Sequence, residues 1–188
     1  EFTHEIEREV IYDSILNKDK TALHEKISEY LENVYSKDIE NYYEALCVHL
    51  IEAGMPKKAA GYYYKTGMKL KDGFNLSSAL DCFDRFLELY GAKPEAESDE
   101  FIAYREKGLI HFINANYSEA LDQFQKALEY AVMQDDADSV KIQIAEVYRD
   151  MGRLDDAWAI MNELEPGLRE GNPNYGKWVQ LKCNILRI

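Results

Sequence analysis

The sequence has little of what an all-β or membrane protein needs. Only 10 glycines and 4 prolines occur in 188 residues, which leaves few sites for the many turns of an all-β chain. No apolar run approaches the ~20 residues of a membrane span. No basic stretch followed by an apolar one forms a leader. These absences favour a soluble helical chain without a targeting segment and without a membrane partner.

Cysteine is also scarce. Cys47, Cys82 and Cys183 are odd in number, widely spaced and set among apolar helical neighbours. This pattern is typical of reduced thiols and does not form a disulfide framework. We therefore expect three free thiols and a cytoplasmic location.

Basic residues are also fewer than acidic ones. The chain has 22 basic against 35 acidic residues, a net charge of −13, so it repels a phosphate backbone and nucleic acid is not expected as a ligand. Acidic residues gather at 95–100 and 135–138, where helical patterns break. Neither stretch has the alternating oxygen ligands and glycine of a calcium loop, so both are predicted to be connecting loops.

Groups that could perform catalysis or bind a metal do not converge in the sequence. His4, His24, His49 and His111 are scattered, and no two of them have the spacing of metal ligands on one helix. Acidic pairs at helical spacing are too frequent in such a chain to indicate acid–base chemistry. We predict no catalytic residue, no metal and no cofactor, and therefore no enzyme in this chain by itself.

A repeated spacing is the strongest positive signal. Gly108 is followed twelve residues later by Ala120 and four residues after that by Phe124. Two antiparallel helices approach closely where small side chains meet, and a large side chain one turn further on fills the adjacent space. The same spacing predicts repeat packing at three more places: Cys47, Ala59 and Tyr63; Gly67, Ala79 and Phe83; Ala145, Ala157 and Met161.

Helical periodicity extends this repeat to nearly the whole chain. It predicts about ten helices, at roughly 4–16, 19–35, 39–53, 56–71, 75–90, 98–114, 117–133, 137–151, 154–168 and 174–187. The first two matches are only 20 residues apart, so the helix at 56–71 must serve two pairs. The predicted fold is all-α, a right-handed superhelical stack of antiparallel helix pairs. We predict a helical lead-in at 1–38 and a repeat array at 39–188 whose last helix is incomplete.

Residues 101–170 resemble tetratricopeptide repeats, a family that binds other proteins. The resemblance rests on residues at positions which that family favours: Gly108, Tyr117, Ala120, Phe124, Ala127, Tyr148, Gly152, Leu154 and Ala157.

The first hundred residues resemble a more particular arrangement, through residues 2–4, 9–16, 23–27, 49–54 and 58–63. They are similar to the helical arm after the ATPase and winged-helix part of large signal-transducing (STAND/AAA-type) ATPases, including members fused to cyclases, kinases or activators. The resemblance implies a sensor or partner-binding arm, with His4 at the end of the winged-helix unit. No glycine-rich phosphate loop is present, so nucleotide cannot be held by this chain alone.

Aromatic residues indicate where a partner binds. The chain has 14 tyrosines, and Tyr62, Tyr63 and Tyr64 together cover most of one helix circumference, so at least one ring leaves the core. If Tyr63 faces the neighbouring helices, Tyr64 turns toward a concave groove. The predicted groove residues are Tyr64, Met68, Arg105, Leu109, Phe112, Ile142, Glu146 and Arg149, with Glu44 and Val48 at the matching positions of the first pair. Alternatively, these residues pack against a terminal helix and the chain fills its own groove.

The sequence therefore predicts a regulatory segment that binds a protein, a peptide or a small effector and passes its occupancy to an attached output domain. The absence of an initial Met and the apolar helical pattern at the end lead us to expect a piece of a larger protein. The alternative is an assembly module. In that case apolar surface near Trp178, Leu181 and Ile185 would pair with a second copy to form a homodimer.

Overall fold

The structure, a computed structural model, describes residues 7, 10, 12–90 and 99–186. Within these residues all regular structure is helical, with nine complete α-helices, one 3₁₀ helix and no strand. The predicted all-α class is confirmed. The chain divides into two compact units, Glu1–Gly91 and Ala92–Ile188, and each is described by itself.

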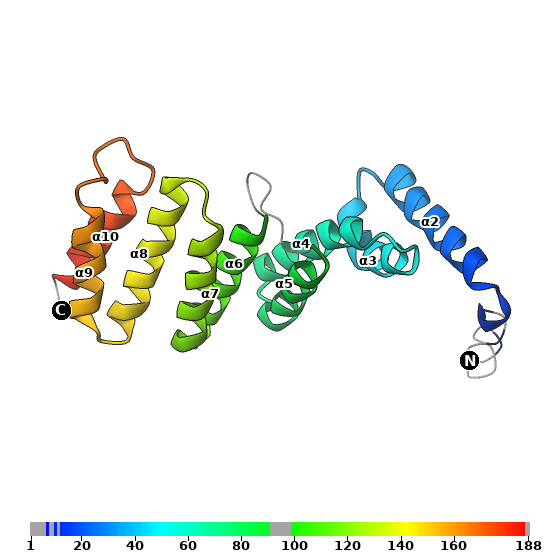
Figure 1. Ribbon diagram of the computed structural model, residues 1–188, viewed down its shortest axis with the longest axis horizontal. Helices are drawn as coiled ribbons and strands as arrows, with labels where there is room; N and C mark the ends of the chain where they lie inside the picture. The colour runs from blue at the N-terminus through cyan, green and yellow to red at the C-terminus, as the bar shows by residue number, and fades with distance from the viewer. Residues whose placement is uncertain (1–6, 8–9, 11, 91–98, 187–188) are drawn as a thin grey trace. The chain divides into compact units, whose positions relative to one another are not determined.

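Unit 1 is a run of helices in which each packs against the next (Figure 1). Its elements are α2 (Asn17–Val34), the 3₁₀ helix η1 (Ile39–Tyr42), α3 (Tyr43–Glu52), α4 (Pro56–Asp72) and α5 (Leu76–Tyr90). Because α4 contacts both α3 and α5, it is shared by two helix pairs, as the short first spacing predicts. The core of the first pair is formed by Leu46, Leu50 and Ala59.

Unit 2 continues the same pattern of neighbouring antiparallel helices (Figure 1). Its elements are α6 (Asp99–Ile113), α7 (Tyr117–Tyr130), α8 (Gln134–Asp150), α9 (Leu154–Leu164) and α10 (Tyr175–Ile185). The last helix packs against both α8 and α9.

The last helix corrects one sequence-based expectation. Trp178, Leu181 and Ile185 are buried in a core cluster with residues of α8 and α9, and do not form an open apolar surface. The indole Nε1 of Trp178 also donates a hydrogen bond of 3.1 Å to the carbonyl oxygen of Met161. The pattern of apolar residues is that of a docked helix, so it gives no reason for pairing with a second copy.

The acidic stretches give a second correction. Residues 135–138 lie in the first turns of α8 and are not a loop, and Asp99 and Glu100 open α6. Acidic side chains stabilise the positive end of a helix dipole, so they extend the helix where composition suggests a connector. Residues 95–98 lie outside the described residues. The division into a helical lead-in at 1–38 and a repeat array at 39–188 stays a prediction, and α2 packs on α3 within unit 1.

The repeated spacing corresponds to direct contact between paired helices. A Cβ atom added to Gly67 would lie 2.9 Å from the ring of Phe83, and one added to Gly108 would lie 2.5 Å from the ring of Phe124. Each glycine therefore provides the space for an aromatic ring of the next helix. Five other repeat positions are fully buried, namely Ala79, Ala120, Ala145, Ala157 and Met161, whereas Tyr63 of the first repeat is only partly buried.

Four turns between helices share one backbone pattern. In each, a residue with positive φ follows the first small residue of the repeat by seven positions; these residues are Gly54, Phe74, Ala115 and Gly152. In the first turn, the Gly54 amide donates to the carbonyl of Ile51 at 2.9 Å, and the Met55 amide donates to that of Leu50 at 2.8 Å. The other three turns repeat both hydrogen bonds. This is the Schellman arrangement, which ends a helix with a left-handed residue.

Two of these turns use a residue that is strained there. Phe74 has φ of 59° and Ala115 has φ of 57°, and a Cβ atom makes this region unfavourable. We expect Ala115→Gly and Phe74→Gly each to raise the free energy of unfolding by about 0.5–1 kcal/mol, measured by urea denaturation. The reverse changes, Gly54→Ala and Gly152→Ala, should lower it by a similar amount. Equal stabilities in all four variants would contradict the left-handed conformation.

Candidate functional site

A groove lies in unit 1 between η1, the start of α3 and the exposed side of α4. It contains an open pocket of about 410 Å³. The pocket is lined by Glu40, Tyr43, Tyr64, Lys65, Met68, Lys69 and Asp72. We call this the η1–α4 groove. Tyr64 and Met68, two of the residues predicted to bind a partner, are both part of it.

The aromatic wall of the groove packs against other aromatic rings that lie outside the groove. The Tyr64 ring packs against the ring of Phe86 on α5, with centroids 5.6 Å apart. At the other side, the Tyr43 ring lies 5.7 Å from that of Tyr62. Lys65 places its ammonium 4.9 Å from the centre of the Tyr62 ring. The wall is thus apolar and packed against neighbouring rings, and the Lys65 cation lies over the negative face of the adjacent Tyr62 ring.

Lys69 connects the two sides of the groove. Its ammonium donates a 2.7 Å hydrogen bond to the backbone carbonyl of Glu40 in η1. An adjoining pocket of about 290 Å³ shares Glu40, Tyr43 and Lys69 with the first. Burial, followed by the charge of Glu40, raises the pKa of Tyr43, so its hydroxyl stays neutral and can donate or accept a hydrogen bond.

A separate apolar pocket of about 300 Å³ lies between α3, α4 and α5 of unit 1. Glu44 and Val48, which the repeat places at groove positions of the first pair, both line it together with Cys47 and Cys82. Burial raises the pKa of Cys47 to about 12 and also raises that of Cys82. Both thiols are therefore neutral at physiological pH and poor nucleophiles.

In unit 2 the structure separates the predicted groove residues into two kinds. Ile142 does not fit the prediction, because it is only 1% exposed and belongs to the core cluster around α10. Leu109 and Phe112 are half-buried and pack against the core of α6, α7 and α8. Position 142 of α8 faces α9, where packing needs an apolar side chain. Ile142 therefore lies in the core although its spacing along the chain is that of a groove residue.

The charged groove candidates of unit 2 are half-buried, and the two arginines among them form ion pairs. Arg105 forms an ion pair of 2.9 Å with Glu106, and Arg149 one of 2.7 Å with Asp150. Burial raises the pKa of Glu146, although Arg149 opposes the shift. A common binding role for these residues stays a prediction.

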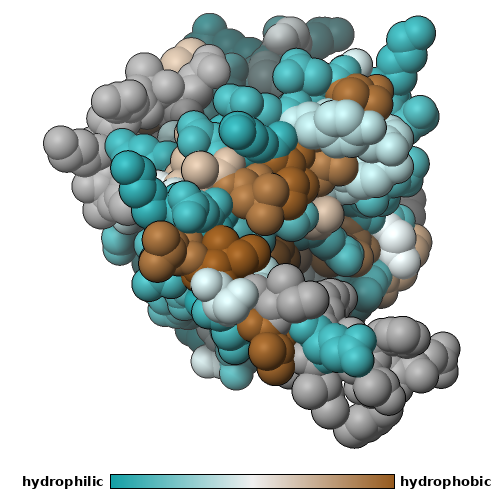
Figure 2. Space-filling view, turned by 90° about the vertical axis from the view of Figure 1, so that its right-hand side faces the viewer, coloured by the Kyte–Doolittle hydropathy of each residue, from teal (hydrophilic) through white to brown (hydrophobic). Residues whose placement is uncertain are grey.

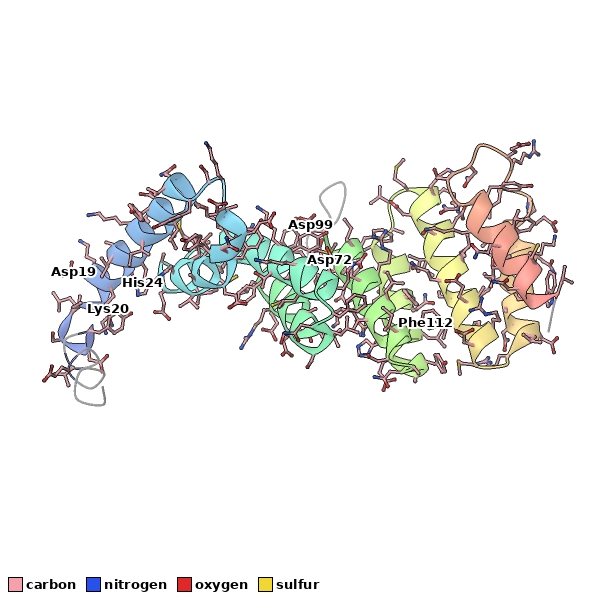
Figure 3. The ribbon with its side chains drawn as sticks, turned by 180° about the vertical axis from the view of Figure 1, so that it is seen from behind. Asp19, Lys20, His24, Asp72, Asp99 and Phe112 are labelled. Carbon is pink, nitrogen blue, oxygen red and sulfur yellow. The ribbon has the colours of Figure 1, made fainter. Side chains whose placement is uncertain are left out.

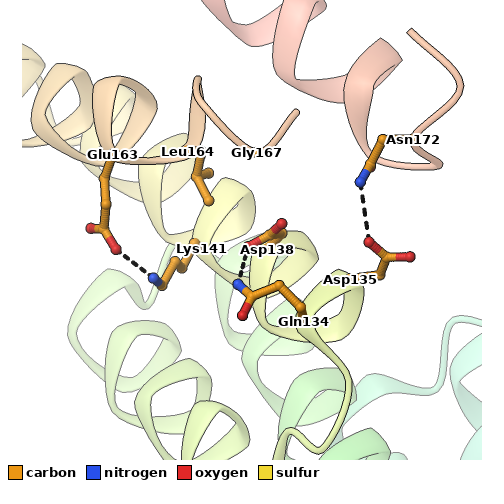
Figure 4. Close-up of a pocket in the computed structure, with 8 residues that line it drawn as sticks. All are labelled: Gln134, Asp135, Asp138, Lys141, Glu163, Leu164, Gly167 and Asn172. Atoms are coloured by element: carbon orange, nitrogen blue, oxygen red, sulfur yellow. Dashed lines mark hydrogen bonds and ion pairs between the residues drawn. The ribbon is translucent and has the colours of Figure 1, made fainter. Parts of the chain in front are cut away.

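Unit 2 also has a polar pocket of about 290 Å³ at the start of α8 (Figure 4). Asp138 accepts a hydrogen bond from Gln134, Asp135 accepts one from Asn172, and Lys141 pairs with Glu163. These side chains satisfy one another, so the pocket is better explained as the junction of α8 with the loop before α10 than as a ligand site.

Sequence reasoning missed two features of unit 1. One is the cationic side of the groove, although α4 carries five lysines and a single aspartate in a strongly acidic chain. The other is a pair of imidazoles: His24 on α2 and His49 on α3 lie 25 residues apart, and their Nδ1 atoms are 2.8 Å from each other. No spacing rule within one helix could have found this pair.

Within the described part of the chain, no group of three or more histidine, cysteine or acidic side chains is arranged to hold a metal ion. No helix there is long and apolar enough to span a membrane. His4, which the resemblance to signalling ATPases singles out, lies outside the described residues.

Comparisons with known proteins gave the following matches. No family model matches the chain, and no curated protein matches it either. Among solved structures, the crystal structure of MamA is similar at a TM-score of 0.48 and 14% sequence identity, over 93% of this chain and 98% of that one. A likeness at this level assigns neither a family nor a ligand.

Proposed function

We propose that this chain is a protein-binding helical repeat module and that the η1–α4 groove of unit 1 holds a peptide segment of its partner. The observation that supports the proposal is an open apolar wall of Tyr43, Tyr64 and Met68 with two lysines at its edge. Aromatic residues and Met are typical of the buried centre of protein interfaces. The volume is within the usual range for a bound side chain or small ligand.

Each wall residue has a separate role in this proposal. A bound apolar side chain lies against Tyr64 and Met68, where it displaces water from rings that α5 already holds in place. Lys65 and Lys69 supply donors for the carbonyl oxygens of an extended peptide. Because the wall is preorganised, binding orders few protein side chains and loses little entropy.

The experiment is selection of peptides from a random display library on the whole chain, followed by affinity measurement by calorimetry. We expect Met68→Glu and Lys65→Glu to weaken binding of the selected peptides at least about tenfold, since central interface residues typically contribute more than 1 kcal/mol. Lys57→Glu is the matched control, because Lys57 is an exposed lysine of the same helix that does not line the groove. Equal losses in all three variants would indicate nonspecific charge attraction and contradict the proposal.

We also propose a wider, regulatory role for the module. The resemblance of the amino-terminal half to the arm of signal-transducing ATPases supports a regulatory segment that reports partner binding to an attached nucleotide switch. The domain content of the intact gene tests this. A phosphate-loop ATPase followed by a winged helix before residue 1 is the expected arrangement, and its absence would remove the regulatory role while leaving the groove unaffected.

Assembly with a second copy is the alternative function, and one surface favours it. The end of unit 1 that carries α2 exposes apolar side chains among hydrophilic ones (Figure 2). The large apolar side chains of α2 and α3 that are exposed to solvent are Leu23, Tyr30, Val34, Val48 and Ile51. Sedimentation equilibrium of the chain and of Leu23→Lys distinguishes the cases. A dimer that the substitution dissociates would support assembly, and a monomer at high concentration would contradict it.

A further inference from the structure

The junction of α2 with α3 contains a hydrogen-bonded chain of three side chains. The hydroxyl of Tyr12 lies 2.8 Å from Nε2 of His24, and Nδ1 of His24 lies 2.8 Å from Nδ1 of His49. His24 is only 8% exposed and lies on the side of α2 turned toward α3 (Figure 3). The imidazole rings are 5.0 Å apart.

The number of protons on the two imidazoles decides whether these hydrogen bonds can form. With both imidazoles neutral, Tyr12 donates to His24, which donates through Nδ1–H to His49. One added proton is also accommodated, because a single N–H still lies between the two Nδ1 atoms. A second proton places N–H groups on both Nδ1 atoms and two positive charges side by side. The hydrogen bond then becomes a repulsion.

We propose that this pair is a latch that holds the amino-terminal half of α2 on α3, and that acidification below about pH 6 opens it by adding the second proton. The open form can bind two protons and the closed form only one. Below this pH the docking constant therefore falls about tenfold for each pH unit.

The pKa shift of His49 and the groups around the pair are consistent with opening at low pH. Burial, followed by the neighbouring His24, lowers the pKa of His49. The folded state thus binds protons less well than the unfolded state, so its stability is present above the ordinary histidine pKa and is lost as the pH falls. From the segment before α2, Tyr12 faces the pair, and the ammonium of Lys20 lies 4.3 Å from the centre of its ring. Asp13 pairs with this lysine at 3.5 Å.

A second contact keeps the other end of α2 in place. Glu32 accepts hydrogen bonds of 2.6 Å from Lys58 and 2.7 Å from the Tyr62 hydroxyl, both on α4. Burial alone would raise the pKa of Glu32, but these hydrogen bonds and the charge of Lys58 lower it overall. Its contribution is therefore lost only below the ordinary glutamate pKa. Between about pH 4.5 and 6 only the histidine latch opens.

The experiment is nuclear magnetic resonance of the whole chain at pH 7.5 and pH 5.5, with backbone ¹⁵N relaxation as the measure of order. We expect amides of residues 12–25 to lose order at pH 5.5, whereas those of residues 29–34 stay ordered. His49→Gln should remain ordered at both pH values, because the side-chain carbonyl oxygen of glutamine can accept the Nδ1–H of His24 without a second charge. His24→Gln should behave in the same way.

His111→Gln, which alters a histidine of unit 2, is the control and should keep the wild-type response. Unchanged order of residues 12–25 in the wild type at pH 5.5 would overturn the latch. An equal loss of order in the wild type and in His49→Gln would overturn it too, because another group would then be responsible.

Discussion

Replacing Gly108 with alanine is expected to lower the free energy of unfolding by about 2 kcal/mol, even though alanine is the better helix former. The added Cβ would lie 2.5 Å from two ring atoms of Phe124, which is fully buried between α6 and α7 and cannot turn away. Circular dichroism during urea denaturation measures the change. Phe124→Leu in the same chain should recover part of the loss, because a smaller side chain leaves space for the methyl group.

Gly61→Ala provides the matched control for this prediction. Gly61 is a helical glycine of α4 with an exposed surface, and an added Cβ would meet no atom within 4 Å. There the usual propensity applies, and alanine should stabilise the chain by about 0.5–1 kcal/mol. The opposite signs of the two substitutions are the expected result. A neutral or stabilising Gly108→Ala would mean that α6 and α7 are not in close contact.

Replacing Trp178 with alanine is expected to have the largest effect of any single substitution considered, a loss of about 3–5 kcal/mol. The indole is buried against α8 and α9, and its Nε1 satisfies the carbonyl of Met161. Trp178→Phe keeps most of the apolar contact and loses the hydrogen bond, so it should cost about 1–2 kcal/mol.

Leu186→Ala is the control at the opposite end of α10, because Leu186 is 69% exposed and its loss should change stability by no more than about 0.5 kcal/mol. A similarly small effect of Trp178→Ala would show that α10 is not docked. Its apolar face would then be available to a partner, and the homodimer through the last helix would become the better explanation.

Much of the fold could be predicted because it depends on local signals. The small residues Gly67 and Gly108 and the aromatic rings opposite them lie on consecutive helices, so their spacing along the chain reports their contact. Errors occurred where a residue had two compatible explanations. Ile142 has the spacing of a groove residue and the chemistry of a core residue, and only the position of α10 decides between them.

The site was predictable only in part, for the same reason. Tyr64 and Met68 are one helical turn apart, and the repeat pattern places them on one face. Tyr43 and Glu40 reach the same groove because η1 tightens the chain before α3, where the sequence suggests a continuous helix from residue 39. The contact between His24 and His49 depends on how α2 lies on α3, which no periodicity within either helix encodes.

The four identical turns have a consequence for how such a chain can change in length. In each of them the left-handed residue follows the first small residue by seven positions and precedes the second by five. Joining residue 74 directly to residue 116 would therefore place Gly67 twelve residues before Ala120 and sixteen before Phe124, the native spacing. Genetic recombination between any two of these turns preserves this spacing, so whole repeats can be gained or lost while the small and large residues keep their places along the paired helices.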